Sequence, residues 1–364
     1  MNVESSVLER YSQGAQQRQE ALCCPVDYDS GLLAMLPQEI IERDYGCGDP
    51  SRYVREGDVV LDLGSGGGKI CYMAAQLVGQ HGRVIGVDMN DDMLALARRH
   101  QADMATRLGG DRVSFHKGNI QDLALDIDAL AHYLAGHPVA SHADYVAMKQ
   151  WEQRQRRDQP MIADASVDLV ISNCVLNLVA DHEKRQLVDE IYRVLKPGGR
   201  IAISDIVSDR PVSAEMKRDP ELWSGCISGA FQEQEFVEAF ARAGFDAVAY
   251  DKWDAQPWRV INEIEFRSVT LTAVRSGEPQ ESTDMKSMMY RGPFSAVIDE
   301  TGETWHRGQR VSVPASIHER LTQPGYNDAF IDLSTGASEA CCTPPNDNRQ
   351  DCCAPEPANG GGCC

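Results

Sequence analysis

The sequence predicts an α/β protein, with a doubly wound parallel sheet followed by a C-terminal α+β extension and a disordered, cysteine-rich tail. Short apolar runs alternate with helical patterns between residues 58 and 210, which is typical of βαβ units and a parallel sheet. Hydrophobic residues make up 42% of the chain and charged residues 25%, so a sizeable core is available. From about residue 333 the chain is rich in glycine, proline and asparagine, which predicts disorder.

The expected strands and helices follow from apolar runs and from their stop signals. Short, largely apolar runs are typical of strands that a parallel sheet buries on both faces. The expected strands cover 59–64, 84–89, 113–120, part of 167–179, 200–207 and 264–275. The expected helices cover 1–20, 71–79, 91–110 and 182–199, the last ending at Pro-Gly-Gly. Residues 211–250 are expected to be helical, with a broken WSGCISG loop between helices.

Composition and pattern divide the chain into five segments. They are an N-terminal helix and cap segment at 1–57, the sheet domain at 58–210, a C-terminal region at 211–275, a small β unit at 288–333 and the tail at 334–364. An insertion at 126–165 interrupts the sheet domain and contains a polar helix. A connection this long is expected to be decoration or, as the less favoured alternative, a lid over the ligand crevice.

Charge and hydropathy exclude several classes of partner. The formal net charge of −20 argues against binding to a nucleic-acid backbone or to anionic lipid. No stretch approaches the roughly 20 apolar residues of a membrane-spanning helix. The N-terminal residues lack the apolar core of a secretory signal, so the expected compartment is the cytoplasm, where thiols stay reduced.

A glycine-rich turn after the first strand predicts a cofactor site. The segment from Asp62 to Gly68 fits E/D-x-G-x-G-x-G, and Asp88 ends the next strand, where an acid can accept hydrogen bonds from a ribose diol. This combination favours a methyltransferase that uses S-adenosylmethionine over a dinucleotide oxidoreductase or a non-catalytic α/β domain. Asn119 and Ile120 are expected beside the adenine, and Asn173 near the amino-acid end. The full predicted set is Asp62, Gly64, Ser65, Gly66, Gly68, Asp88, Met89, Asn119, Ile120 and Asn173.

The twelve cysteines point to soft-metal, metalloid or redox chemistry. Cys47, Cys71, Cys174 and Cys226 are placed so that all four could face the cofactor's sulfonium, because ligands of open α/β sheets bind beyond the carboxyl ends of the strands. No neighbouring His-Asp or Glu pair indicates a general base. A thiophilic acceptor such as arsenic(III), which has a lone pair and no proton to lose, fits these residues. The alternative for any isolated cysteine is a small buried hydrophobe.

From Tyr45 to about Arg275 the chain resembles arsenite S-adenosylmethionine methyltransferases. The resemblance rests on YGCG (45–48), DLGSGGGKICY (62–72), ISNCVLNLV (171–179) and WSGCISGA (223–230). It implies a Rossmann-like methyltransferase sheet at 58–210 and an arsenic-binding region at 211–275. It also implies that Cys174 and Cys226 hold arsenic(III), with Cys47 or Cys71 as third ligand, and that these last two take part in a thiol relay.

The resemblance also implies a substrate and a reductant, and the sequence allows alternatives for the function and for the Cys-Cys pairs. The implied substrate is arsenite as a thiol conjugate, and the implied reductant is thioredoxin or glutathione. The alternatives are a methyltransferase of selenium, tellurium or an organic acceptor, and a non-catalytic metalloid sensor or buffer. Cys23-Cys24 is a capture pair or only a loop. The three Cys-Cys pairs of the tail are expected either to collect arsenite for the site or to be dispensable.

Overall fold

The computed structural model describes residues 3–16, 26–43, 45–277, 284–323, 325–326 and 328–334. The predictions for Cys23, Cys24 and the tail cysteines therefore lie outside the described residues. In the described part, no helix is both long enough and apolar enough to cross a membrane.

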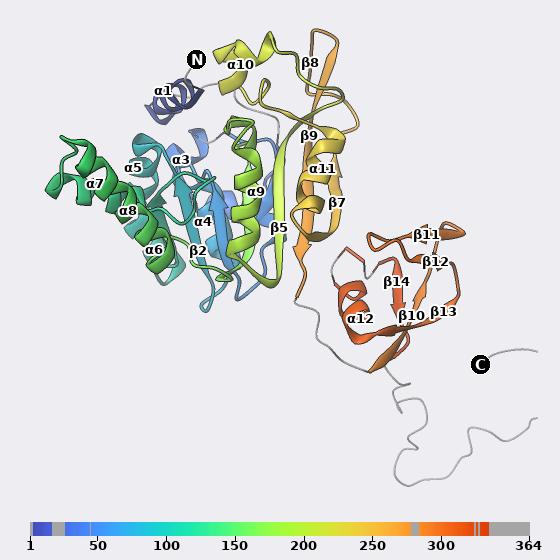
Figure 1. Ribbon diagram of the computed structural model, residues 1–364. Helices are drawn as coiled ribbons and strands as arrows, with labels where there is room; N and C mark the ends of the chain where they lie inside the picture. The colour runs from blue at the N-terminus through green and yellow to red at the C-terminus, as the bar shows by residue number, and fades with distance from the viewer. Residues whose placement is uncertain are drawn as a thin grey trace, which may run out of the picture.

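The fold is built on a nine-stranded mixed sheet (Figure 1). Its parallel half consists of β1 (Val59–Leu63), β2 (Arg83–Asp88), β3 (Val113–Lys117), β4 (Val167–Asn173) and β5 (Leu195–Ser208). The strand order is β3-β2-β1-β4-β5-β9-β7, and β1 pairs in parallel with both β2 and β4. The order therefore reverses beside β1, which is where a doubly wound sheet opens a ligand crevice.

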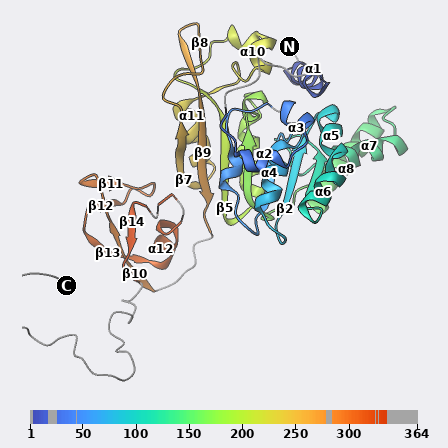
Figure 2. The ribbon, with the colours of Figure 1, turned by 180° about the vertical axis from the view of Figure 1, so that it is seen from behind.

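Helices cover both faces of this sheet. α9 (Lys184–Val194) and α11 (Glu233–Arg242) pack on one face, while α4 (Lys69–Leu77), α5 (Asp91–Arg99) and α6 (Gln101–Leu108) pack on the other. Figure 1 shows α9 in front of the sheet, and Figure 2, from behind, shows α4 in front. Side chains of β1 alternate accordingly: Val60 joins the core beneath α4, whereas Leu61 and Leu63 join the core beneath α9. The predicted doubly wound α/β class is confirmed.

Two of the predicted helices differ from the structure. The helix expected at 91–110 is interrupted at His100, between α5 and α6. α9 ends at Val194, and β5 already begins at Leu195 and runs through Pro-Gly-Gly, so that motif does not end the helix. A residue that precedes proline is pushed out of the helical region, which explains why Lys196 is already extended.

The stretch expected to be helical up to residue 250 ends earlier, in a strand. β7 (Phe245–Trp253) lies at the edge of the sheet and pairs antiparallel with β9 (Ile264–Arg275), which itself pairs antiparallel with β5. Gly244, with a φ of +94°, turns the chain from α11 into β7. Two short strands, β6 (Phe231–Gln232) and β8 (Arg259–Ile261), extend this half of the sheet.

The insertion forms a helical hairpin at the β3 side of the sheet (Figure 1). It consists of α7 (Ile127–Gly136), which the sequence did not predict, and α8 (His142–Asp158). Stacked rings of Tyr133 and Trp151, with centroids 4.7 Å apart, hold the two helices together. The whole insertion lies within the described range 45–277, and none of its residues between 126 and 160 lines the cofactor pocket described below. In this structure the insertion therefore lies apart from the pocket.

The C-terminal β unit has its own small core. Its elements are β10 (Met285–Tyr290), β11 (Ala296–Ile298), β12 (Thr304–His306), β13 (Arg310–Pro314), α12 (Ala315–Leu321) and β14 (Phe330–Asp332). Trp305 and Phe330 pack edge to face within that core. The unit contacts the sheet at its edge strand, where the amide of Ala247 donates to the hydroxyl of Tyr326 at 3.0 Å.

Candidate active site

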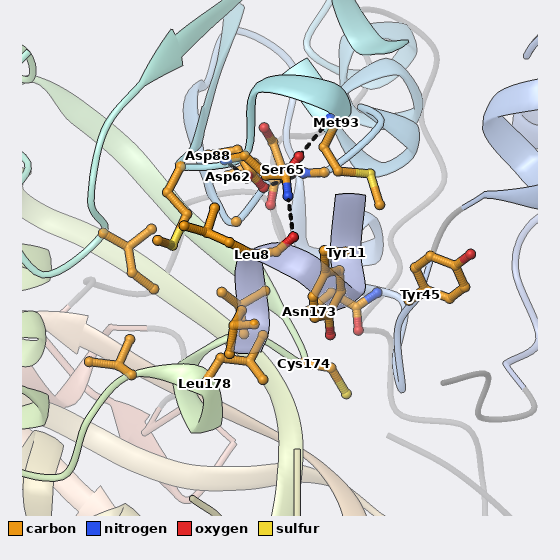
Figure 3. A pocket seen from close by; sticks show the side chains of 18 of the residues that line it. Leu8, Tyr11, Tyr45, Asp62, Ser65, Asp88, Met93, Asn173, Cys174 and Leu178 are labelled. Carbon is orange, nitrogen blue, oxygen red and sulfur yellow. Dashed lines mark hydrogen bonds between the residues drawn. The ribbon is translucent and has the colours of Figure 1, made fainter. Parts of the chain in front are cut away.

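A large pocket opens at the carboxyl ends of β1, β2 and β4 (Figure 3). Its volume is about 1050 Å³. Eight of the predicted cofactor residues line it: Asp62, Gly64, Ser65, Gly66, Asp88, Met89, Ile120 and Asn173. Gly68 and Asn119 do not line it. The topology of the parallel strands thus brings together residues that are more than 100 positions apart in sequence.

The glycine-rich turn shapes the floor of this pocket. Gly64, Gly66 and Gly68 all have positive φ values, of 71°, 50° and 86°, which other residues adopt only with strain. A Cβ on Gly64 would lie 2.4 Å from Cγ1 of Val175, whereas a Cβ on Gly66 would meet nothing within 4 Å. A Cβ on Gly68 would lie 2.8 Å from the ring of Phe115. The absence of a side chain at Gly68 therefore lets the start of α4 pack against Phe115.

Asp88 holds the turn and faces the pocket. Its carboxylate accepts hydrogen bonds from the amides of Gly66 and Asn90, both at 2.8 Å. Burial raises the pKa of Asp88 above its ordinary value, although these backbone donors act in the opposite direction. A polyol ligand such as a ribose can supply further donors to this carboxylate.

Three of the four predicted cysteines meet beside the pocket. Cys174 directly follows β4, Cys226 follows α10 (Pro220–Ser224), and Cys47 lies in the segment before β1. Cys47 and Cys174 form a disulfide with their Cα atoms 5.9 Å apart, and the thiol of Cys226 donates to the carbonyl of Cys174 at 3.1 Å. All three are buried. Both Cys174 and Cys226 have a φ near +60°, a backbone strain that is typical of functional sites.

The fourth cysteine, Cys71, is elsewhere. It lies in the first turn of α4, fully buried in the core between that helix and the sheet. Its sulfur lies 3.2 Å from the carboxylate of Asp62. The structure therefore does not place Cys71 in the group formed by Cys47, Cys174 and Cys226. The cause is helical phase, because α4 starts at Lys69 and turns its third residue toward β1.

Asn173 holds the backbone of the loop that contains Cys47. Its side-chain oxygen accepts hydrogen bonds from the amides of Cys47 at 2.9 Å and Gly48 at 3.0 Å, and its amide nitrogen donates to the carbonyl of Gly48 at 2.8 Å. One side chain at the end of β4 thus fixes the YGCG loop against the strand that carries Cys174. Asn173 also lines the cofactor pocket, so it connects the two parts of the site.

Asp205, on β5, was not predicted. A carboxylate oxygen of Asp205 and the sulfurs of Cys47 and Cys174 all lie within 4.8 Å of one another. Asn177 donates to this carboxylate through its side chain at 2.7 Å, and the amide of Ile206 donates at 2.8 Å. Burial raises the pKa of Asp205 to about 7.

A second, smaller cavity lies between the cofactor pocket and Cys226. Its lining includes Cys174, Cys226, Tyr11, Tyr45 and Trp258. Tyr11 belongs to α1 (Val3–Gln16), whose residues the sequence did not single out. Among the described residues that line either cavity there is no histidine. The three cysteines suit an acceptor that binds thiolates.

Comparisons with known proteins agree with this geometry. A family model described as a methyltransferase domain matches residues 55–134 and 141–244, and a domain of unknown function matches 278–360. An arsenite methyltransferase of Mus musculus is 31% identical over 84% of this chain and 75% of its own length. One of Aquipseudomonas alcaligenes is 37% identical over 59% of this chain, which spans only 51% of that relative. The crystal structure of an arsenic(III) S-adenosylmethionine methyltransferase from Chlamydomonas reinhardtii is similar, with a TM-score of 0.58, 27% identity and coverage of 86% and 98% of the two chains.

Proposed function

Because this chain belongs to the arsenite methyltransferase family, we propose that it transfers methyl groups from S-adenosylmethionine to trivalent arsenic, giving methylated arsenicals and so detoxifying arsenic. The observation that carries the proposal is the meeting of Cys47, Cys174 and Cys226 at the same strand ends that line the cofactor pocket. Thiolates are the ligands that soft ions prefer, and three of them match the trigonal site of arsenic(III).

In this proposal Cys174 and Cys226 hold the arsenic, and Cys47 is the third ligand. The proximity of Cys47 to Cys174 supports Cys47 over Cys71 in this role. The disulfide between Cys47 and Cys174 must first be reduced, because a thiolate and not a disulfide sulfur binds the ion. Arsenite arrives as a conjugate of glutathione or of a protein thiol and exchanges onto the cysteines.

The turn from Gly64 to Gly68 would hold the cofactor, with Asp88 on its ribose, Asn119 and Ile120 beside its adenine and Asn173 near its amino-acid end; all of these except Gly68 and Asn119 line the pocket. The arsenic lone pair attacks the methyl carbon, and S-adenosylhomocysteine leaves. Acceleration comes mainly from the alignment of lone pair, methyl group and sulfur, since no proton has to be removed from the acceptor.

Methyl transfer uses the arsenic lone pair and therefore formally oxidises arsenic by two electrons. Two thiolates return these electrons when they form a disulfide, and the Cys47–Cys174 disulfide is a product of this kind. We place Cys71 in the same relay. Thioredoxin or glutathione then reduces the disulfide, which fits a reducing compartment such as the cytoplasm.

Product analysis tests the proposal. Reduced full-length protein is incubated with arsenite and methyl-labelled S-adenosylmethionine, and labelled methylated arsenicals are expected on chromatography. Label transferred only to selenite, tellurite or an organic acceptor would assign a different methyltransferase. Arsenite bound without any labelled product would assign a sensor or buffer.

Two variants test the assigned ligands. Cys174→Ser and Cys226→Ser should each abolish arsenite methylation while binding of the cofactor survives, because a hydroxyl is a poor ligand for a soft ion. Cys364→Ser is the matched control and should keep its rate at saturating arsenite. Near-normal turnover in Cys174→Ser or Cys226→Ser would show that the ligands are assigned wrongly.

A further inference from the structure

Helix α1 contacts the cofactor side of the site. The side-chain amide of Asn90 donates to the carbonyl of Leu8 at 3.1 Å and to the hydroxyl of Ser12 at 3.1 Å, both on α1. Asn90 itself donates its backbone amide to Asp88, which lines the cofactor pocket. Val7, Leu8 and Tyr11 line the same pocket, and Figure 3 shows Leu8 and Tyr11 among the side chains that surround it. The position of α1 is therefore tied to the residues that are expected to hold the cofactor's ribose.

The same helix also contacts the loop that carries Cys226. The guanidinium of Arg10 donates to the hydroxyl of Ser224 at 2.8 Å and to the carbonyl of Glu221 at 2.9 Å. Ser224 is the last residue of α10, two positions before Cys226. Figures 1 and 2 both show α1 beside α10.

Tyr11 connects the two sides directly. It lines both the cofactor pocket and the smaller cavity, and Cys226 lines the smaller cavity beside it. Burial and the adjacent side chain of Cys226, with which the hydroxyl interacts, raise the pKa of Tyr11. The ring of Tyr11 packs edge to face on Tyr45, with centroids 6.1 Å apart, and this contact limits its rotation. The thiol of Cys226 donates its own proton to the carbonyl of Cys174, so the Tyr11 hydroxyl is the donor to the sulfur.

Binding of a soft ion removes the proton from Cys226 and with it the hydrogen bond to the carbonyl of Cys174. The Tyr11 hydroxyl can still donate to the thiolate sulfur, and hydrogen bonds to a charged acceptor are stronger than those to a neutral one. The sulfur then stays directed toward the smaller cavity, which shares Tyr11, Tyr45 and Cys174 with the cofactor pocket. A small error in this direction would cost rate, because the attacking atom must be in line with the methyl group.

We propose that Tyr11 is a positioning residue that fixes the sulfur of Cys226 relative to the cofactor, and that α1 thereby couples occupation of the cofactor pocket to binding of arsenite. The proposal rests on the proposed function. The two ligand sites share helix α1, which is hydrogen-bonded to Asn90 and to Ser224 and which places Tyr11 in the lining of both cavities. Each ligand is therefore expected to favour the position of α1 that the other requires.

The test compares Tyr11→Phe with Tyr133→Phe, the same change on the distant α7, where the ring stacks on Trp151. Tyr11→Phe keeps the ring and removes only the hydroxyl. We expect its kcat to fall about 10-fold, as for one lost hydrogen bond to a charged group, while KM for the cofactor changes less than about twofold. Tyr133→Phe should match the wild type in both constants.

A binding measurement separates positioning from general damage to the fold. In the wild type, saturating arsenite should tighten binding of S-adenosylhomocysteine by about fivefold or more, and the reciprocal effect should be equal. Tyr11→Phe, and independently Arg10→Met, should bind each ligand alone but lose this coupling, with unchanged thermal unfolding. Tyr133→Phe should retain it.

The outcomes are distinguishable. A Tyr11→Phe protein with wild-type kcat and wild-type coupling overturns the inference. Wild-type protein that methylates arsenite but shows no coupling also overturns it, and leaves the proposed function intact. Wild-type protein that couples the two ligands without forming product supports the role of α1 and refutes the proposed function, whereas wild-type protein that binds no arsenite overturns both.

Discussion

Replacement of Asp88 by alanine is the sharpest test of the cofactor site. The carboxylate accepts two backbone hydrogen bonds of 2.8 Å and faces the pocket, where ribose hydroxyls would add further donors. Loss of a hydrogen bond to a charged group costs about 1.5–3 kcal/mol, so Kd for S-adenosylhomocysteine should rise about 10- to 150-fold. Isothermal titration calorimetry measures this change directly. Asp91→Ala, at a side chain that is 75% exposed, is the matched control and should leave Kd unchanged.

The pH dependence of binding follows from the same residue. Burial raises the pKa of Asp88 in the free protein, so its contribution to folding stability is present at low pH and is lost as pH rises through the folded-state pKa. Ribose donors favour the ionised carboxylate, so cofactor binding lowers that pKa, releases a proton and becomes tighter as pH rises through it. Titrations in buffers of different ionisation enthalpy count the released proton. Unaltered affinity in Asp88→Ala, or proton release that persists in this variant, would refute the reasoning.

Two further predictions concern the glycine turn and the tail. Gly64→Ala places a Cβ 2.4 Å from Val175 and should destabilise the fold by about 1–3 kcal/mol more than Gly109→Ala, which has the same φ of +71° but no neighbour within 4 Å; equal losses in denaturant unfolding would show that the clash is relieved. A chain truncated after Thr335 lacks the three Cys-Cys pairs and should keep its maximal rate, yet need more arsenite to reach it and bind fewer arsenic atoms. Identical arsenite dependence and stoichiometry in the truncated and full-length chains would exclude a delivery role.

The sequence was sufficient for the parallel half of the sheet because each strand there is a local apolar run. It was insufficient for β7, whose residues alternate between the core and solvent and whose strand state depends on pairing with β9, far along the chain. Pro-Gly-Gly was misleading for a related reason. The motif does disfavour a helix, but β5 already begins two residues before Pro197 and pairs with β4 there.

The site residues also divide into those that a local sequence pattern predicts and those whose position depends on tertiary packing. Cys174 and Asn173 were predictable because they end a parallel strand, and strand ends meet at one edge of the sheet whatever the loops do. Cys71 does not join Cys47, Cys174 and Cys226 in this structure, because a helix turns each side chain by about 100° per residue and the sequence does not fix which phase of α4 faces the pocket. Asn119 does not line the pocket in this structure, whereas its neighbour Ile120 does.

The rule that located Asn173 could also have found Asp205, because an acid in the apolar run RIAISD marks the corresponding edge of β5. No such rule reaches Tyr11. Its helix is largely polar, and its placement depends on hydrogen bonds to Asn90 and Ser224, which belong to two different parts of the fold. Tyr11 is supplied by a helix outside the sheet, and the position of that helix is fixed by the surfaces on which it docks. Positioning groups of this kind therefore emerge only from the assembled structure, whereas the ligands that they position can be found in the strand ends of the sequence.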